Sequence, residues 1–551
     1  MSVATSSPVR PPRHRPLTNL VPRQDTMTHR QFIASSAIIT VALMFLQFAW
    51  AMSTPVFRGP DEPVHVNSVM RVATTGTWPK AGEADIDPVI IDAAREAGLI
   101  FPNATSFASV NRYRLHYTDR NEGRPRVDLA TITPPIERSS FGIVKGENPG
   151  STVVDQMTQH PPLYYAIAAG VVKIFHLWNT PWDTTIYTLR MLSIIILLPV
   201  TPCFIYTARR LGASRPWALA AGLIPAMIPQ FYHITTLVTN DVLTASLGAL
   251  VMAALVTAGT EPISRRTIAL VGATLGLALW SKGQILVFGL PLILVFALRP
   301  EPWRVRAKAI VASGTVALII GWWWLVNILR YHTVQPGGYP QVYPDSWDPS
   351  QADVGYFVSH ALRAYNDSFW TAFGWLEVTF PILLGATLTI LTAITFVLGA
   401  LKSTSPATIF AMGSTAIGLM ALLLGQAWYG SYLPGGYLSG LQGRYAFPLI
   451  VVMAVCVLAF DQRSPYALNA FTMWVGLAAS AGFIYLLKAC YRSGSWYSNE
   501  RMATQLGVEE LTVRVILGLG ALGLLVALAT VIWSGRTLIP EADRAPRHAA
   551  C

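Results

Sequence analysis

Long apolar runs recur along the chain and alternate with short polar stretches. Twelve of these runs have roughly the length of a membrane span, and they lie at 32–52, 186–207, 217–238, 241–258, 267–283, 284–298, 309–329, 379–400, 407–427, 446–460, 467–488 and 512–533. Because a helix needs about 20 apolar residues to cross a bilayer, the pattern predicts an all-α polytopic membrane protein. A thirteenth apolar stretch, at 161–178, is shorter and begins with two prolines.

The first run also has features of a cleavable leader. It ends in Ala-Trp-Ala at 49–51, which resembles a signal-peptidase site, but about 21 residues is long for a signal core. We therefore interpret 32–52 as a retained span. Residues 1–31 are expected to be a disordered basic cytoplasmic tail, within which Met27 is an alternative start.

Basic residues orient the runs, because Lys and Arg collect in cytoplasmic loops. Five arginines precede the first span, which places its start in the cytoplasm. If 161–178 crossed the membrane, the basic loops around Arg209 and Arg304 would lie outside. If 161–178 lies along the interface or re-enters, both loops lie inside. We therefore predict twelve crossings, one non-crossing helix and cytoplasmic termini, with a thirteenth crossing as the alternative.

Composition supports this class. The 551 residues are 52% hydrophobic and 13% charged, whereas soluble domains carry about 25% charged residues. The net charge of +11 fits basic cytoplasmic loops, and no Arg/Lys-rich stretch interleaved with aromatics predicts a nucleic-acid partner. The cysteines have no metal-binding spacing and lie at Cys203, Cys456, Cys490 and Cys551.

The predicted topology divides the chain into five parts. The tail 1–31 precedes a membrane module at 32–330, which includes a long external loop at 54–160. An external aromatic loop follows at 331–377, then carboxyl-terminal membrane helices at 378–535 and a tail at 536–551. The external loop shows no separate soluble domain.

Two adjacent acids follow the first span in FRGPDEPVH at 57–65. Charge is scarce in this chain, and acids at a bilayer edge are costly unless they are used. Asp61 is a candidate general base for an acceptor hydroxyl, and Glu62 opens a helix whose dipole it complements. His65 lies one turn beyond Asp61 if VHVNSVMRV is helical. The alternative is that the acids are simply solvated.

Further polar residues fall on the same predicted outer side, namely His160, Asn240, Asp241, Lys282, Gln442 and Arg444. The topology was assigned from the basic loops, which contain none of these residues. Their location on one side is therefore independent of the residues that fixed the orientation. It predicts one polar site at the outer membrane surface. Lys282 and Arg444 suit a phosphate or pyrophosphate.

Each of these residues also has a structural alternative. Asn240 and Asp241 are compatible with a helix N-cap, and Lys282 with a snorkelling lysine. Arg444 is compatible with pairing to a loop acid, and His160 with a plain interfacial residue. The aromatic segment at 368–381 fits a membrane-interface belt, or a surface for a sugar or isoprenoid chain. Walker, Rossmann and zinc patterns are missing, which argues against a cytosolic nucleotide site.

Five of these segments together resemble a known family pattern. They are PDEPVH at 60–65, HPPLYY at 160–165, ND at 240–241, FWTAFGW at 369–375 and QGRY at 442–445. Their order resembles that of a bacterial family of integral membrane proteins similar to the GT-C superfamily of membrane glycosyltransferases. The resemblance implies a GT-C fold with interfacial helices and a catalytic carboxylate in the first external loop.

The resemblance also implies roles. Asp61 would be the base, with Glu62 as helper or substitute. Asn240 and Asp241 would line the sugar or acceptor side, and Lys282 and Arg444 would hold the leaving phosphate. His65, His160 and Gln442 complete the expected substrate-binding set. Some GT-C enzymes need a divalent metal, and the sequence leaves that open.

We therefore expect a glycosyltransferase of the plasma membrane. It would transfer a hexosyl or pentosyl group from a polyprenyl-phosphate sugar to a glycan or glycolipid acceptor of the cell envelope, outside the cytoplasm. The alternatives are a transporter or flippase of lipid-linked glycans and a non-catalytic envelope-assembly protein. Transport would favour charges in mid-membrane, and the spans hold few. The sugar, the acceptor and the oligomeric state stay open.

Overall fold

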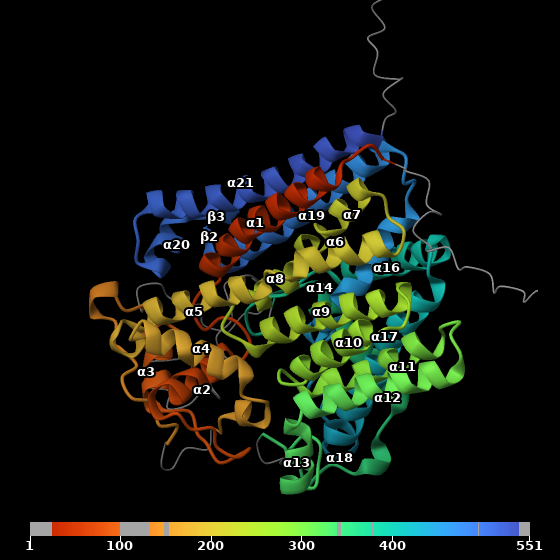
Figure 1. Cartoon of the computed structure of the whole chain (residues 1–551). Helices are drawn as coiled ribbons and strands as arrows, with labels where there is room; N and C mark the ends of the chain where they lie inside the picture. The colour runs from red at the N-terminus through yellow and green to blue at the C-terminus, as the bar shows by residue number, and fades with distance from the viewer. Residues whose placement is uncertain are drawn as a thin grey trace, which may run out of the picture.

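The computed structural model describes residues 25–99, 132–147, 154–338, 343–376, 378–493 and 495–538. Most of the predicted tail at 1–31, nearly all of the tail at 536–551, and parts of both external loops lie outside these residues. Helices make up nearly all of the described regular structure, so the all-α prediction is confirmed (Figure 1).

The α-helices are α1 (His29–Ser53), α2 (Glu62–Thr75), α3 (Pro88–Glu96), α4 (Leu163–Ile174), α5 (Trp182–Leu197), α6 (Val200–Arg210), α7 (Arg215–Ala221), α8 (Pro229–Thr235), α9 (Asn240–Thr260), α10 (Arg265–Ala278), α11 (Gly289–Ala297), α12 (Trp303–Ile320), α13 (Trp323–Tyr331), α14 (Val354–Trp370), α15 (Phe373–Leu376), α16 (Ile382–Lys402), α17 (Pro406–Ala427), α18 (Leu433–Gly435), α19 (Pro465–Tyr491), α20 (Asn499–Leu506) and α21 (Glu510–Gly535). The 3₁₀ helices are η4 (Pro135–Glu137), η5 (Gln156–Gln159), η6 (Leu177–Asn179), η7 (Ile224–Met227), η8 (Gly283–Phe288), η9 (Pro349–Gln351), η11 (Gly443–Ala459) and η12 (Arg536–Leu538). The π-helix η10 spans Trp428–Tyr432, and the short strands are β1 (Val378–Thr379), β2 (Arg492–Ser493) and β3 (Trp496–Tyr497).

Several helices have the length and composition of a membrane span. Among the described residues there are seven, or eight if α12 and α13, which meet at 70°, count as one bent span. The seven are α1, the α5–α6 pair, α9, α16, α17 with its continuation to Gly435, α19, and α21 with its continuation to Leu538. The first and last of them, α1 and α21, run side by side (Figure 1).

Besides the bent α12–α13 pair, four predicted spans differ from one helix of spanning length. The run at 217–238 is divided among α7, η7 and α8, and the run at 446–460 forms the 3₁₀ helix η11. Pro225, Pro229 and Pro448 lie in these segments, and proline disrupts a helix because it lacks an N–H and clashes with the preceding turn. The other two are α10, which has only 14 residues, and the η8–α11 pair.

Burial explains how the broken segment α7–η7–α8 is tolerated. Every residue from 216 to 246 except Met227 is buried within the protein. Irregular backbone at membrane depth occurs only where protein covers it, because lipid offers no hydrogen bonds. The segment therefore belongs to the interior rather than to the lipid-facing surface.

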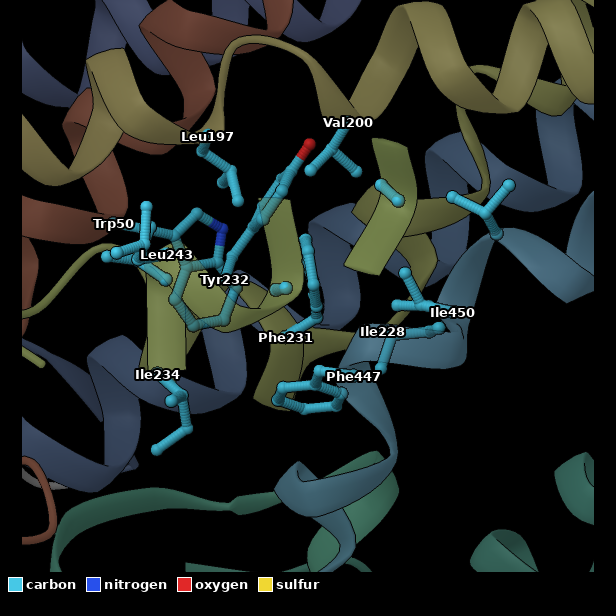
Figure 2. Close-up of a cluster of buried hydrophobic side chains, with 14 of the residues drawn as sticks. Trp50, Leu197, Val200, Ile228, Phe231, Tyr232, Ile234, Leu243, Phe447 and Ile450 are labelled. Carbon is cyan, nitrogen blue, oxygen red and sulfur yellow. The ribbon is translucent and has the colours of Figure 1, made fainter. Parts of the chain in front are cut away.

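A cluster of buried hydrophobic side chains holds α8 in this interior (Figure 2). Trp50 of α1 lies 6.4 Å from Tyr232 of α8, measured between ring centroids. Phe231 of α8 meets Phe447 of η11 edge to face at 5.1 Å. Leu243, which lies on α9, belongs to the same cluster (Figure 2). This packing fixes the segment that leads directly into the first turn of α9.

The helices α2, α3 and α4 pack together beside the long helices (Figure 1). Asp155 is fully buried and pairs with Arg71 of α2 at 2.9 Å. It also accepts hydrogen bonds from Ser68 at 2.7 Å and Asn67 at 2.8 Å.

With 12 residues, α4 rises only about 18 Å, which is shorter than a bilayer core of about 30 Å. Its length fits the predicted non-crossing helix.

Part of the aromatic segment at 368–381 lies inside the protein rather than at its surface. Trp370 and Phe373 are buried, and the Phe373 ring lies 5.8 Å from that of Trp50. Trp375 donates from Nε1 to the Phe57 carbonyl at 2.9 Å. These side chains pack inside the protein and support the loop that carries Asp61, so the predictions of a belt and of sugar stacking are wrong for Trp370 and Phe373.

Candidate functional site

The loop between α1 and α2 presents Asp61 in an uncommon backbone conformation. Phe57 and Asp61 have φ values of 61° and 64°, in the left-handed region that costs an ordinary residue about 1–2 kcal/mol. Gly59 lies against Leu237, and a Cβ there would come within 1.9 Å of that side chain. The loop is therefore pressed against the segment that precedes α9.

Glu62 is held in place by four donors and is fully buried. Its Oε1 accepts hydrogen bonds from Arg190 Nε at 2.9 Å and from the Val238 amide at 3.2 Å. Its Oε2 accepts from Arg190 Nη2 at 2.7 Å and from the Phe57 amide at 2.9 Å. Because a carboxylate has about four lone-pair positions, none is left for a substrate proton. This geometry favours a positioning role over the expected role of helper base.

Arg190 was missed among the sequence candidates. From α5 it also donates to the carbonyls of Ala51, Thr54 and Pro55. It therefore ties the end of α1, the loop and the start of α2 together. The signal in the sequence was an arginine inside the apolar run TLRMLSIIILLPV, since an ionisable residue within a span is expected to have a defined partner.

Four charged residues from distant parts of the chain form a continuous cluster. Arg444 Nη2 lies 2.6 Å from Asp61 Oδ2, and Arg444 Nη1 lies 3.5 Å from Asp241 Oδ2. Lys282 pairs with the other oxygen of Asp241. We call Asp61, Asp241, Lys282 and Arg444 the charge cluster.

Exposure separates one member of the charge cluster from the rest. The side chains of Asp241, Lys282 and Arg444 are 3%, 8% and 4% exposed, whereas that of Asp61 is 23% exposed. Their formal charges cancel, which makes burial of so many ions tolerable. Lys282 is buried and paired with Asp241, so the snorkelling alternative is wrong. Arg444 does pair with a loop acid, Asp61, and this pair is itself part of the charge cluster.

The first turn of α9 positions Asp241. Thr239, not Asn240 or Asp241, is the N-cap residue, and its hydroxyl accepts from the Asp241 amide at 3.2 Å. The alternative in which Asn240 and Asp241 form the N-cap is therefore wrong, because the cap lies one residue before Asn240. Both lie inside the first turn, where a carboxylate is stabilised by the helix dipole.

A glycine lets the QGRY segment reach the site. Gly443 donates from its amide to Ser368 Oγ at 2.7 Å, and a Cβ at this position would lie 2.3 Å from the Phe369 amide nitrogen. Beyond it, the Tyr445 ring lies 5.4 Å from Lys282 Nζ and 5.6 Å from the Arg444 guanidinium carbon. The close backbone contact at Gly443 positions Arg444, and the Tyr445 ring lies near both Arg444 and Lys282.

Two histidines border the charge cluster. His65 is buried, with Nδ1 3.0 Å from the Tyr165 hydroxyl and Nε2 3.2 Å from that of Thr239. Burial, and next the positive charge of Lys282, hold the pKa of His65 well below its usual range. The same two causes lower the pKa of His160 well below its usual range. Both rings are therefore neutral at neutral pH.

Several polar atoms are buried without a hydrogen-bond partner among the described residues, and they belong to the charge cluster, to its neighbours in the sequence and to His160. Asn240 is fully buried and leaves both amide atoms unpaired. The others are Asp241 Oδ2, Arg444 Nε, His160 Nδ1 and Gln442 Oε1. Leaving such an atom unpaired costs about 1–3 kcal/mol, so a concentration of them is typical of a site that binds a polar ligand.

The structure thus brings together the residues that the sequence singled out in four distant segments. Asp61, Asp241, Lys282 and Arg444 touch directly, and His65 and His160 lie within electrostatic range of Lys282. Glu62 lies next to them but faces Arg190. Their chemical roles stay predictions.

The donor set fits a metal ion poorly. In the part of the chain that the structure describes, no three His, Cys, Asp or Glu side chains are grouped to hold one. Asp61 and Asp241 instead face Lys282 and Arg444, whose charges oppose a cation. We derive no step through a metal.

Comparison with known proteins identifies one family. The family described as "Predicted membrane protein (DUF2142)" matches residues 44–453. No curated protein matches the chain.

Solved structures with related shape include those of two proteins. ArnT from Cupriavidus metallidurans bound to undecaprenyl phosphate is 15% identical, with a TM-score of 0.46, over 94% of this chain and 79% of that one. Its apo form has the same identity and TM-score over 93% and 80%. An Archaeoglobus fulgidus oligosaccharyltransferase tethered with an acceptor peptide is 14% identical, with a TM-score of 0.31, over 85% and 55%. At these TM-scores the likeness carries no argument about activity.

Proposed function

The chain belongs to this family of membrane proteins, and on that premise we propose that it is a glycosyltransferase of the GT-C type. It transfers a hexosyl or pentosyl group from a polyprenyl-phosphate donor to a glycan or glycolipid acceptor at the outer face of the plasma membrane. The observation that carries the proposal is the charge cluster, in which the partly exposed Asp61 pairs with Arg444, and Arg444 and Lys282 share the buried Asp241.

The cations supply the donor site. A guanidinium binds two phosphate oxygens at once, and an ammonium adds a point charge. Arg444 and Lys282 both pair with Asp241, and we assign both cations to one phosphate group. The long apolar helices place the protein in a bilayer, in which a polyprenyl chain is soluble.

Asp61 supplies the base. It is the most exposed acid of the charge cluster, and Glu62 has no free lone pair. The acceptor oxygen forms a bond to the anomeric carbon while the bond from that carbon to the phosphate oxygen breaks. The acceptor proton goes to Asp61, and the electron pair leaves with the phosphate, whose charge Lys282 and Arg444 stabilise.

The unpaired polar atoms suit sugar hydroxyls. Asn240 offers a donor and an acceptor, and His160 and Gln442 each offer one further atom. A site built to bind hydroxyls discriminates strongly against analogues that lack them, because its own polar groups then stay unpaired. We therefore assign these three residues to recognition of the sugar or the acceptor.

A transfer assay tests the proposal. Purified protein is given a panel of radiolabelled polyprenyl-phosphate sugars with a membrane extract as acceptor. We expect Asp61→Asn to lower transfer at least about 100-fold, the usual contribution of a general base. The exposed loop acid Asp345 provides the matched control, and Asp345→Asn should transfer normally. Binding of lipid-linked sugars without transfer from any of them would favour transport or scaffolding instead.

A further inference from the structure

Arg444 is shared between two acids in this structure. Its Nη2 lies 2.6 Å from Asp61, and its Nη1 lies 3.5 Å from Asp241. Both terminal nitrogens of the guanidinium therefore already face carboxylates of the protein. An incoming phosphate has to compete with one of these acids for the guanidinium.

The two acids differ in how firmly they are held. Asp241 is 3% exposed, pairs with Lys282 and lies in the first turn of α9. Asp61 is 23% exposed, and its other side-chain partner among the described residues is the uncharged amide of Gln156 at 3.3 Å. Asp61 is therefore the acid that can leave Arg444 with little loss, since its carboxylate regains contact with water.

Arg444 can also donate a hydrogen bond beyond those to its present partners. Its Nε is buried and lacks a hydrogen-bond partner in the described part of the chain. The Tyr445 ring lies against the guanidinium, with its centroid 5.6 Å from the central carbon. A phosphate that replaced Asp61 would find Nη2 and Nε on one edge of the guanidinium, which is the bidentate arrangement.

We propose that Asp61 is a displaceable occupant of the anion site, and that the donor phosphate takes its place on Arg444. This inference rests on the proposed function and adds an order to it. The carboxylate becomes free to act as base only when the phosphate is bound, so donor binding precedes proton removal from the acceptor. Until then the base and the cation neutralise each other.

Competition makes an unusual prediction for binding. Removing the charge of Asp61 should strengthen binding of a phosphate lipid while it abolishes transfer. With undecaprenyl phosphate as the probe, Asp61→Asn should bind about two- to fivefold more tightly than wild type, the scale expected for a partly exposed ion pair. Asp345→Asn, which removes an exposed acid elsewhere, should bind like wild type.

A double-mutant cycle separates displacement from a general change of charge. The effect of Asp61→Asn is measured again in an Arg444→Gln background, with each variant checked for folding by thermal unfolding. Displacement predicts that the gain in affinity disappears there, because the shared guanidinium is gone. A gain of equal size in both backgrounds, or no gain in either, would overturn the inference. Wild type that binds no undecaprenyl phosphate would instead overturn the proposed function, and with it this inference.

Discussion

Arg190 donates two parallel hydrogen bonds to Glu62, from Nε to Oε1 at 2.9 Å and from Nη2 to Oε2 at 2.7 Å. Both side chains are fully buried, and they join positions 128 residues apart. The pair separates the roles of two adjacent acids. Glu62 anchors the loop, and Asp61 beside it faces the charge cluster.

Replacing Glu62 tests this separation. Glu62→Gln should lower the free energy of unfolding by about 3–5 kcal/mol, because it leaves Arg190 buried without its counter-charge. Transfer should fall together with stability. Thermal unfolding in detergent and the transfer assay measure the two effects, with the exposed Glu83→Gln as control. Loss of transfer at unchanged stability would instead indicate that Glu62 takes part in the chemistry.

Asn240 and Asn67 offer a matched comparison. Asn67 donates to Asp155 at 2.8 Å and accepts from the Asp87 amide at 3.0 Å, whereas Asn240 leaves both amide atoms unpaired within the described structure. We expect Asn67→Ala to lower the unfolding temperature. Asn240→Ala should leave it nearly unchanged and reduce transfer roughly tenfold or more. A large loss of stability in Asn240→Ala would argue for a structural role.

Gly443 controls the placement of Arg444. In Gly443→Ala the new methyl group would lie 2.5 Å from the Tyr365 carbonyl oxygen, so the backbone must shift. We expect a loss of about 1–3 kcal/mol in stability, together with weaker binding of undecaprenyl phosphate. Gly425→Ala in α17 is the control, because no neighbouring atom lies within 4 Å of its added carbon. Normal lipid binding by Gly443→Ala would contradict the proposed link.

The buried histidines predict a dependence of stability on pH. The folded-state pKa of His65 is lowered, so below the ordinary histidine value of about 6.5 the unfolded chain binds a proton that the folded chain does not. Stability should therefore fall as the pH drops from 7.5 to 5, by up to about 1.4 kcal/mol per pH unit for each such group.

His65→Asn isolates one histidine from this effect. The variant should lose less stability than wild type over the same pH range, while His160, whose pKa is also lowered, continues to contribute. Thermal unfolding at several pH values measures the difference. An acid-induced loss equal to that of wild type would show that His65 does not titrate in this way.

The sequence predicted the features that follow directly from the spacing of apolar and basic residues along the chain. Apolar runs predicted helices, and basic loops predicted that the segments carrying Asp61, Asp241, Lys282 and Arg444 end on one side of the membrane. Residues at one end of a helix bundle have few places to lie, which is why the structure finds them in contact.

Long-range packing was the part that the sequence left open. The bond between Glu62 and Arg190 depends on how α2 meets α5, and periodicity does not encode that meeting. The broken helices around Pro225 and Pro229 look apolar enough to span, but the protein interior accepts them as short pieces. Phe373 likewise resembles a surface aromatic until the neighbouring Trp50 is known.

Release of free polyprenyl phosphate tests the proposed role of the charge cluster most directly. The measurement follows its formation from a polyprenyl-phosphate sugar, with and without acceptor, by wild type and by Asp61→Asn. We expect acceptor-dependent release by wild type and at least about 100-fold slower release by the variant, whose binding of undecaprenyl phosphate is retained or strengthened. Equal release by both proteins would contradict the assignment of Asp61 as the base.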